Sequence, residues 1–171
     1  MKRLAALALL SCSCLQGVPD DISCLGDQTC PTDWYCNNGN VCRALADGTP
    51  PTLKLVGVGD SSGDAAGTTA SAPLSGGYIW LTVANTGDQD AAQVGISFDA
   101  PPCTGLDPSL PPTMMPYVTA GQSTVVQATV SNPVLPCPDS TVTVTMSVPQ
   151  GNATAVFDRV TTGSFTLHVG P

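Results

Sequence analysis

Residues 77–99 read GYIWLTVANTGDQDAAQVGISFD, and this stretch decides the fold. In its first and last parts, apolar residues alternate with other residues: Ile79, Leu81, Val83, Val94, Ile96 and Phe98. Side chains of a strand point to opposite faces with period two, so each part predicts a strand with one apolar face. Between them, residues 85–90 are rich in Asn, Asp and Gly, which favour turns. The stretch therefore predicts a β-hairpin, whose apolar face is buried only when further strands cover it.

The remainder of residues 52–171 continues this pattern. Four further stretches predict strands: residues 53–58, 122–131, 140–148 and 164–169. Residues 154–157 predict a short edge strand, residues 59–76 a flexible loop of small residues, and residues 100–116 an irregular, proline-rich segment. Six or seven strands at this spacing indicate an all-β fold, an antiparallel sandwich of two sheets.

The composition fits β structure in an acidic protein. Glycine (17) and proline (16) are abundant, aromatic residues make up 5%, and all thirteen acidic residues are Asp, which suits turns better than helices. The formal net charge is −8, and without a leader containing Lys2 and Arg3 three cations would face thirteen aspartates, for a charge of −10. So few cations argue against nucleic acid and anionic lipid headgroups as partners.

The N-terminus has the pattern of a secretory signal peptide. A basic start precedes the apolar residues 4–10, a run too short to span a bilayer, which needs about twenty residues. Residues 9–12, LLSC, resemble the bacterial lipobox. That resemblance implies cleavage after Ser11, a diacylglyceryl group on Cys12 and an acylated amino terminus.

The lipobox resemblance also implies a location. Ser13 is not Asp, the residue that such lipoproteins use for retention in the inner membrane, so the bacterial outer membrane or cell surface is expected. Several acyl chains would then hold the protein at a membrane. The alternative is a secreted protein, cleaved near the same place and carrying no lipid.

Eight cysteines are present, and a signal peptide makes disulfides permissible. Lipidation of Cys12 leaves seven, and Cys14, ahead of any folded segment, is the odd one. Four cysteines recur at equal intervals: Cys24, Cys30, Cys36 and Cys42. So short a segment cannot build a hydrophobic core, so two disulfides are expected, with three pairings left open. Zinc is the rival interpretation, but zinc usually takes closer cysteine pairs or histidines.

Residues 24–43 resemble the short cysteine-rich modules that follow the anchor in bacterial surface lipoproteins, although Asp33 stands at the first glycine position of that pattern. Within the module, Trp34 is either apolar cover for the disulfides or an exposed contact residue. The chain thus divides into a signal peptide, a lipidated tether, the cysteine-rich module, a linker and the main domain: residues 1–11, 12–23, 24–43, 44–51 and 52–171.

The main domain holds two cysteines of its own. Cys103 and Cys137 each lie beside a proline, in the segments that flank the strand predicted over residues 122–131. A disulfide between them would contribute about 3 to 4 kcal/mol on the chain-entropy model. We therefore expect these two cysteines to be paired.

Residues 83–87, VANTG, followed by Ala91 and Ala92, resemble the core motif of the CARDB type, a bacterial adhesion-related immunoglobulin-like domain. The AGQS stretch at residues 120–123 is similar to that family's lead-in to a strand. The resemblance implies an extracellular immunoglobulin-like β-sandwich that acts as a spacer or binding module. The proline-rich residues 100–116 depart from the simple family pattern.

Motifs for catalysis are not evident. His168 alternates with apolar neighbours, and the sequence places no nucleophile or carboxylate beside it. Four aspartates in glycine-rich turns are the calcium candidates: Asp60, Asp64, Asp88 and Asp90. Their spacing matches no EF-hand, and the chain lacks the Glu that usually completes one. We expect no enzyme and no cofactor beyond that calcium candidate.

Two functions remain. The first is a non-enzymatic cell-surface lipoprotein that acts as an adhesion or binding module, or as a structural part of an envelope assembly, through a protein or glycan partner. The second is a secreted inhibitor or carbohydrate-binding protein that uses the cysteine-rich module, with Trp34, or an aromatic patch of Tyr78, Trp80 and Tyr117. Tyr78 and Trp80 fall on the face opposite Ile79, and we expect them in the core of a second sheet, not on an exposed platform.

Overall fold

The computed structural model describes seven parts of the chain: residues 22–24, 29–36, 41–44, 48–91, 93–110, 117–148 and 159–170. The signal peptide, the lipid site at Cys12, the odd Cys14, Ala92 of the CARDB-like motif and the edge strand predicted over residues 154–157 lie outside the described residues.

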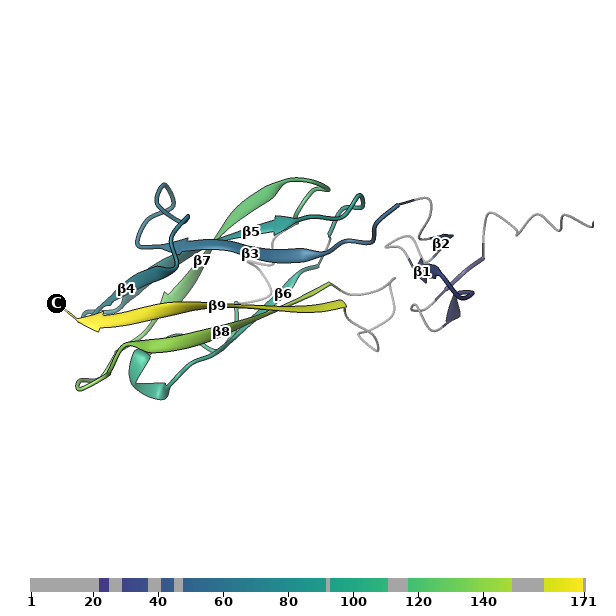
Figure 1. Cartoon of the computed structure of the whole chain (residues 1–171). Coiled ribbons are helices and arrows are strands. Elements are labelled where there is room, and N and C mark those ends of the chain that lie inside the picture. Colours follow the sequence, from purple (N-terminus) through teal and green to yellow (C-terminus); the bar gives the residue numbers. More distant parts are fainter. Residues whose placement is uncertain are drawn as a thin grey trace, which may run out of the picture.

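Two facing β-sheets form the main domain (Figure 1). One sheet has the order β3-β5-β7, with β3 at Leu53–Gly59, β5 at Gly77–Asn85 and β7 at Ser123–Val130. The other has the order β4-β9-β8-β6, and its strands in that order are Thr69–Pro73, Arg159–Gly170, Ser140–Val148 and Gly95–Asp99. These strand pairs are antiparallel except β4 and β9, which run parallel.

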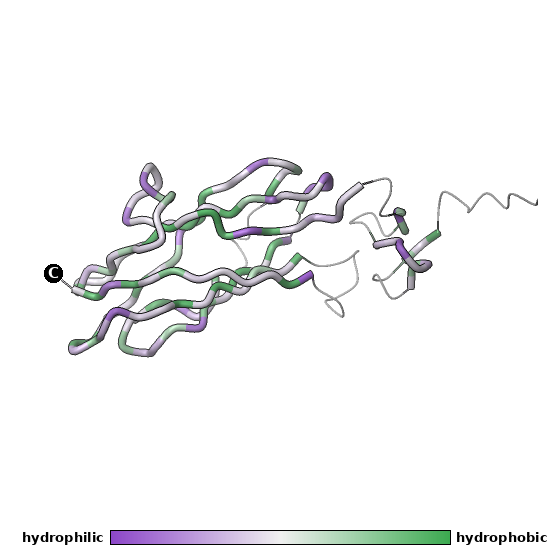
Figure 2. The backbone as a smooth tube through the Cα atoms, viewed as in Figure 1, coloured by the Kyte–Doolittle hydropathy of each residue, from purple (hydrophilic) through white to green (hydrophobic). Residues whose placement is uncertain are grey.

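The predicted fold class is confirmed. The orders β3-β5-β7 and β6-β8-β9 are those of strands A-B-E and C-F-G in immunoglobulin-like domains, so the domain is an immunoglobulin-like β-sandwich. Its core consists of the inward-facing residues of both sheets, which recur with period two along the strands. Figure 2 shows green, apolar positions in the strands of the sandwich. Members of this core include Ile79, Leu81, Val83, Ile96, Phe98, Val126, Ala128, Val142, Val144, Met146, Phe165 and Leu167.

The predicted hairpin is wrong, although both of its strands exist. β5 pairs with β3 and β7, whereas β6 lies in the other sheet beside β8. The connection between them carries two fully buried residues, Ala91 and Val94, which belong to the core between the sheets. Burial of these two apolar side chains between the sheets directs the chain from one sheet into the other. We call this connection, from the end of β5 to the start of β6, the β5–β6 arch.

The loop predicted over residues 59–76 is also partly wrong, because it contains β4. The side chains of Ala70 and Ala72 are buried in the core, and β4 adds a parallel strand to the edge of the four-stranded sheet beside β9. The rest of this loop folds back over β3. A Cβ at Gly57 would lie 2.5 Å from the Cα of Ala66, so glycine allows that close approach.

Residues 100–110 join one edge of each sheet. A short 3-10 helix at Pro102–Thr104 (η3) holds Cys103, which forms the expected disulfide with Cys137. Further along, the N–H of Asp107 donates to the carbonyl of Thr129 on β7 at 3.0 Å, and the N–H of Leu110 donates to the carbonyl of Ile96 on β6 at 3.0 Å. The irregular segment therefore closes this side of the sandwich.

The cysteine-rich module contains two short antiparallel strands, β1 at Trp34–Cys36 and β2 at Cys42–Ala44. Its disulfides are Cys24–Cys36 and Cys30–Cys42, which selects one of the three pairings that the spacing allowed. The sulfurs are largely shielded, and they form the core of the module with Trp34 packed against them. In the described parts of the chain, no helix is both long and apolar enough to cross a membrane.

Candidate functional site

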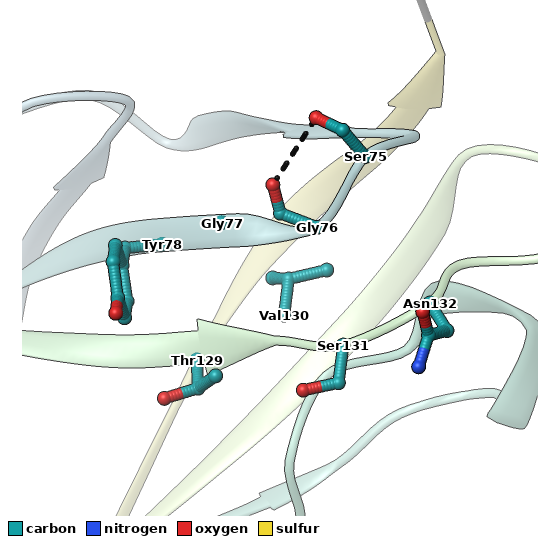
Figure 3. Close-up of a pocket in the computed structure, with 8 residues that line it drawn as sticks. All are labelled: Ser75, Gly76, Gly77, Tyr78, Thr129, Val130, Ser131 and Asn132. Carbon is teal, nitrogen blue, oxygen red and sulfur yellow. Dashed lines mark hydrogen bonds between the residues drawn. The ribbon is translucent and has the colours of Figure 1, made fainter.

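Two hollows meet at Tyr78, at the end of the sandwich that lies away from the cysteine-rich module. The first is lined by residues 75–78, where the chain enters β5, and by residues 129–132 at the end of β7 (Figure 3). The second is lined by Asp60, Ser71, Pro73, Gly170 and Tyr78 itself. Each has a volume of about 300 Å³. Gly170 ends β9, so both hollows lie near the end labelled C in Figure 1.

The backbone explains why Tyr78 stands there. Tyr78 pairs with Thr129 across β5 and β7, so the two side chains share the outer face of the sheet. The turn before β5 ends at Gly76, whose φ is +76°. Glycine adopts this left-handed backbone conformation without the steric strain that a side chain would cause. A Cβ at Gly76 would lie 3.0 Å from the carbonyl oxygen of Val130, so the turn sits close against the end of β7.

The lining of the first hollow is polar and uncharged. It offers the hydroxyls of Ser75, Thr129 and Ser131 and the amide of Asn132, beside a tyrosine ring that is 52% exposed. The hydroxyl of Ser75 donates to the carbonyl of Gly76 at 3.4 Å, which is the dashed line in Figure 3.

The second hollow contains one charge. The carboxylate of Asp60 accepts a hydrogen bond from the N–H of Ser71 at 2.5 Å, which ties the end of β3 to β4. Neither hollow has a Lys or Arg in its lining.

The structure does not bring the three aromatic candidates together. Tyr78 and Trp80 lie on the outer face of the three-stranded sheet, Tyr78 exposed and Trp80 half-buried, so the expectation that they fill a core is wrong. A loop and solvent, not a second sheet, meet this outer face: the β3–β4 loop lies over Thr82, whose hydroxyl donates to the carbonyl of Ala65 at 2.5 Å, and Tyr78 is left exposed. Tyr117 lies elsewhere, in the segment that pairs with Ala91 beyond the opposite end of β5.

Tyr117 has a structural partner. Its hydroxyl donates to the carboxylate of Asp90, and the other oxygen of that carboxylate accepts the N–H of Ala120 at 2.8 Å. The hydrogen bond from Tyr117, followed by that from Ala120, lowers the pKa of Asp90, and the same bond to Asp90 raises the pKa of Tyr117. Although it is 59% exposed, Tyr117 therefore has a structural role, because its hydrogen bond joins its own segment to the turn that contains Asp90.

The cysteine-rich module contacts the sandwich through Arg159, the first residue of β9. The guanidinium of Arg159 lies 5.3 Å from the centre of the Tyr35 ring, and its Nη2 donates to the carbonyl of Cys36 at 3.4 Å. Tyr35 is buried and Trp34 is half-buried against the disulfides, so Trp34 serves at least in part as apolar cover.

The linker is fastened to the β5–β6 arch. Thr49 and Asp88 exchange two hydrogen bonds, because the N–H of Thr49 donates to the Asp88 carboxylate at 2.9 Å and the N–H of Asp88 donates to the Thr49 carbonyl at 2.9 Å. The N–H of Thr52 donates to Oδ1 of Asn85 at 3.1 Å. A Cβ at Gly87 would clash with the carbonyl oxygen of Pro50. The residues of the VANTG motif thus hold the linker in place.

The carboxylates of the four calcium candidates all accept hydrogen bonds from protein groups, and three of them do so from residues distant in the sequence. Beyond the bonds to Asp60, Asp88 and Asp90 given above, the carboxylate of Asp64 accepts the hydroxyl of Ser61 at 2.8 Å. Across the described ranges, three or more metal-ligating groups gather only at Cys24, Cys30 and Cys42, whose sulfurs are in disulfides. The described parts of the chain therefore bring no cluster of carboxylates together for calcium.

His168 has a carboxylate partner that sequence reasoning missed. Its Nδ1 lies 2.5 Å from Oδ1 of Asp139, which precedes β8 and is distant in the sequence. Ser71 is the neighbour of His168 across the parallel β4–β9 pair. Among the described residues, no hydrogen bond joins Ser71 to His168, so the imidazole is paired with a carboxylate but not with a nucleophile.

No family model matches the chain, and neither curated proteins nor solved structures yield a significant match.

Proposed function

We propose that this chain is a non-enzymatic, lipid-anchored protein of the bacterial cell surface, and that its sandwich presents a partner-binding end away from the membrane. The observation that carries this proposal is the arrangement of the molecule along its length. The module and linker lie at one end, where Leu53 pairs with Asn85, and the hollows around Tyr78 lie at the other, where Gly77 pairs with Val130.

The connection between module and sandwich supports a presenting role. Linker hydrogen bonds to Asp88 and Asn85, together with the contacts of Arg159, hold the module against the sandwich. A lipid on Cys12 would enter the molecule from the module side, because the module follows that cysteine in the chain. The hollows would then face outward from the envelope.

The disulfides support an oxidising compartment. Three disulfides join described cysteines, and such bonds persist outside the cytosol. Together with the leader-like N-terminus, they favour export, and the LLSC sequence favours retention on a membrane by acyl chains.

The test is a pair of cysteine substitutions in the full chain, expressed in a bacterial host that has an outer membrane. Cys12→Ser should abolish labelling by radioactive palmitate and move the protein out of the outer-membrane fraction, because the acylated thiol is lost. Cys14→Ser is the matched control and should leave both the labelling and the fractionation unchanged.

Mass spectrometry of the purified protein decides the same point directly. We expect an N-terminal peptide that begins at Cys12 and carries three acyl chains. An unacylated amino terminus on protein recovered from the medium would refute the anchored form and favour the secreted alternative.

A further inference from the structure

The exposed ring of Tyr78 separates two hollows and belongs to the lining of both. Such a ring offers an apolar face to a ligand that crosses it, while the depressions on either side accept the ligand's neighbouring units. The two hollows, each of about 300 Å³, are at the lower end of the size range of ligand sites in proteins. The geometry therefore suits an elongated ligand made of small units.

The polar groups of the lining select the ligand's chemistry. In the first hollow, the hydroxyls of Thr129 and Ser131 and the amide of Asn132 are exposed or half-exposed beside the ring. Hydroxyl and amide groups can both donate and accept hydrogen bonds, which matches a ligand rich in hydroxyls. The C–H faces of sugar rings supply the apolar surface that an aromatic ring covers.

Charge excludes the acidic ligands. The linings contain no Lys or Arg, the second hollow holds the carboxylate of Asp60, and the whole chain has a formal charge of −8. A sulfated, phosphorylated or uronic-acid ligand would meet no positive partner and an unfavourable field. An apolar peptide fits poorly as well, because the first hollow is lined mainly by hydroxyl, amide and backbone groups.

We propose that these two hollows bind a neutral oligosaccharide, with one sugar unit on the ring of Tyr78, the next unit against Thr129 and Ser131, and a further unit beside Asp60. This inference rests on the proposed function, since it names the partner class that the outward end of the surface protein would hold. The donor and acceptor groups of Thr129 and Ser131 fix the sugar's hydroxyls, and Asp60 accepts from a hydroxyl of the unit in the second hollow.

The experiment measures binding of soluble chito-, cello-, malto- and manno-oligosaccharides to the purified disulfide-bonded protein by isothermal titration calorimetry. We expect at least one series to bind with a dissociation constant of about 1 mM or tighter. Tyr78→Ala should weaken that binding by about tenfold or more, because the stacking face is lost. Tyr78→Phe should retain most of it, because the ring remains.

The chain offers a matched control. Tyr117 is as exposed as Tyr78 but lines neither hollow, so Tyr117→Ala should change the affinity by less than about twofold. Thr129→Val keeps the β-branched shape and removes one hydroxyl, and should weaken binding by about threefold to tenfold. Circular dichroism and thermal melts confirm that each variant is folded.

Three outcomes would overturn the proposal: no binding of any of the four series by the unaltered protein, equal losses for the Tyr78 and Tyr117 variants, or tighter binding of an acidic glycan such as heparin fragments than of every neutral one. None of these outcomes bears on whether Cys12 is lipidated. If sugars fail to bind while Cys12→Ser still releases the protein from the membrane, the surface lipoprotein proposal stands and only the ligand class is refuted.

Discussion

The side chain of Asn85 connects three segments of the molecule. Its side chain is 1% exposed, and its Nδ2 donates to the carbonyls of Gln89 at 2.6 Å and Val118 at 3.1 Å. Its Oδ1 accepts the N–H groups of Thr52 and Gly87, both at 3.1 Å. One amide therefore joins the linker, the arch and the segment before β7, which explains in physical terms why an Asn stands in this motif.

Replacement of Asn85 by Ala should destabilise the sandwich by about 3 kcal/mol, because the N–H groups of Thr52 and Gly87 and the carbonyl of Gln89 would lose their Asn85 partner in a buried or partly buried place. The carbonyl of Val118 would keep only the N–H of Ala91. The measurement is equilibrium unfolding in guanidinium chloride, and the dependence of the free energy of unfolding on denaturant concentration should be unchanged. Gln122→Ala, at an exposed position of the neighbouring turn, should change the free energy of unfolding by less than about 0.5 kcal/mol. Equal losses for both variants would contradict the role assigned to Asn85.

Among the elements, the strands were predictable from the sequence and some of their partners were not. The apolar patterns located β3, β5, β6, β7 and β8, and the second half of β9, where one face of the strand is buried. The arch was misread because residues 85–90 have the chemistry of a hairpin turn, whereas burial of Ala91 and Val94 decides where the chain goes next. The burial of Ala91 and Val94 depends on the facing sheet, and the local sequence pattern carries no information about that sheet.

Two further differences have the same origin. β4 reads TASAP, whose buried residues are alanines, and it forms by pairing with the distant β9 instead of through strand propensity. In β5 the face opposite Ile79 carries the large rings of Tyr78 and Trp80, so alternation could not decide whether that second face is buried too. Of the candidate site, the sequence analysis named Tyr78 as a binding residue and Asp60 only as a calcium candidate. It could not foresee Thr129, which lies beside Tyr78 through the register of β7, or Ser131, which follows that strand. Asp139 likewise reaches His168 through the β7–β8 connection.

The disulfide between η3 and the β7–β8 connection should be a main support of the closing segment. Simultaneous replacement of Cys103 and Cys137 by Ser should lower the free energy of unfolding by about 3 kcal/mol on the chain-entropy model, because the unfolded chain regains the freedom of a loop spanning 34 residues. Urea unfolding of the variant and of the unaltered protein provides the comparison. A loss that disappears when both are measured in a reducing agent identifies the bond as its cause, and no loss without the reducing agent would contradict the prediction.

At the scale of the whole molecule, Arg159 and the linker supply contacts between the cysteine-rich module and the sandwich within the part of the chain that the structure describes. Arg159 reaches from β9 to the ring of Tyr35 and the carbonyl of Cys36, and cation–π contacts of this kind contribute about 0.5 to 1 kcal/mol at exposed sites. The hydrogen bonds between Thr49 and Asp88 hold the linker on the other side of the junction.

Arg159→Ala should therefore loosen the module without unfolding the sandwich. In residual dipolar coupling measurements, residues 29–36 should cease to share the alignment of residues 77–85, while the melting temperature of the sandwich falls by less than about 5 °C. Lys54→Ala removes an exposed cation of β3 and should leave the shared alignment intact. If the Arg159 variant keeps a single alignment, contacts other than those of Arg159 hold the junction.

The pairing of β3 with β5 has a mechanical consequence. β3 begins beside the linker and β5 begins beside Tyr78, and the two run antiparallel next to each other. Suppose that the module is pulled in one direction and a molecule bound at Tyr78 is pulled in the other. The force then acts along β3 and β5, and the backbone hydrogen bonds between these strands are perpendicular to the force. Bonds loaded in shear must rupture together, whereas bonds at the end of a peeled strand open one at a time. The strand order thus gives mechanical resistance to a protein that is stretched between its membrane anchor and a bound partner.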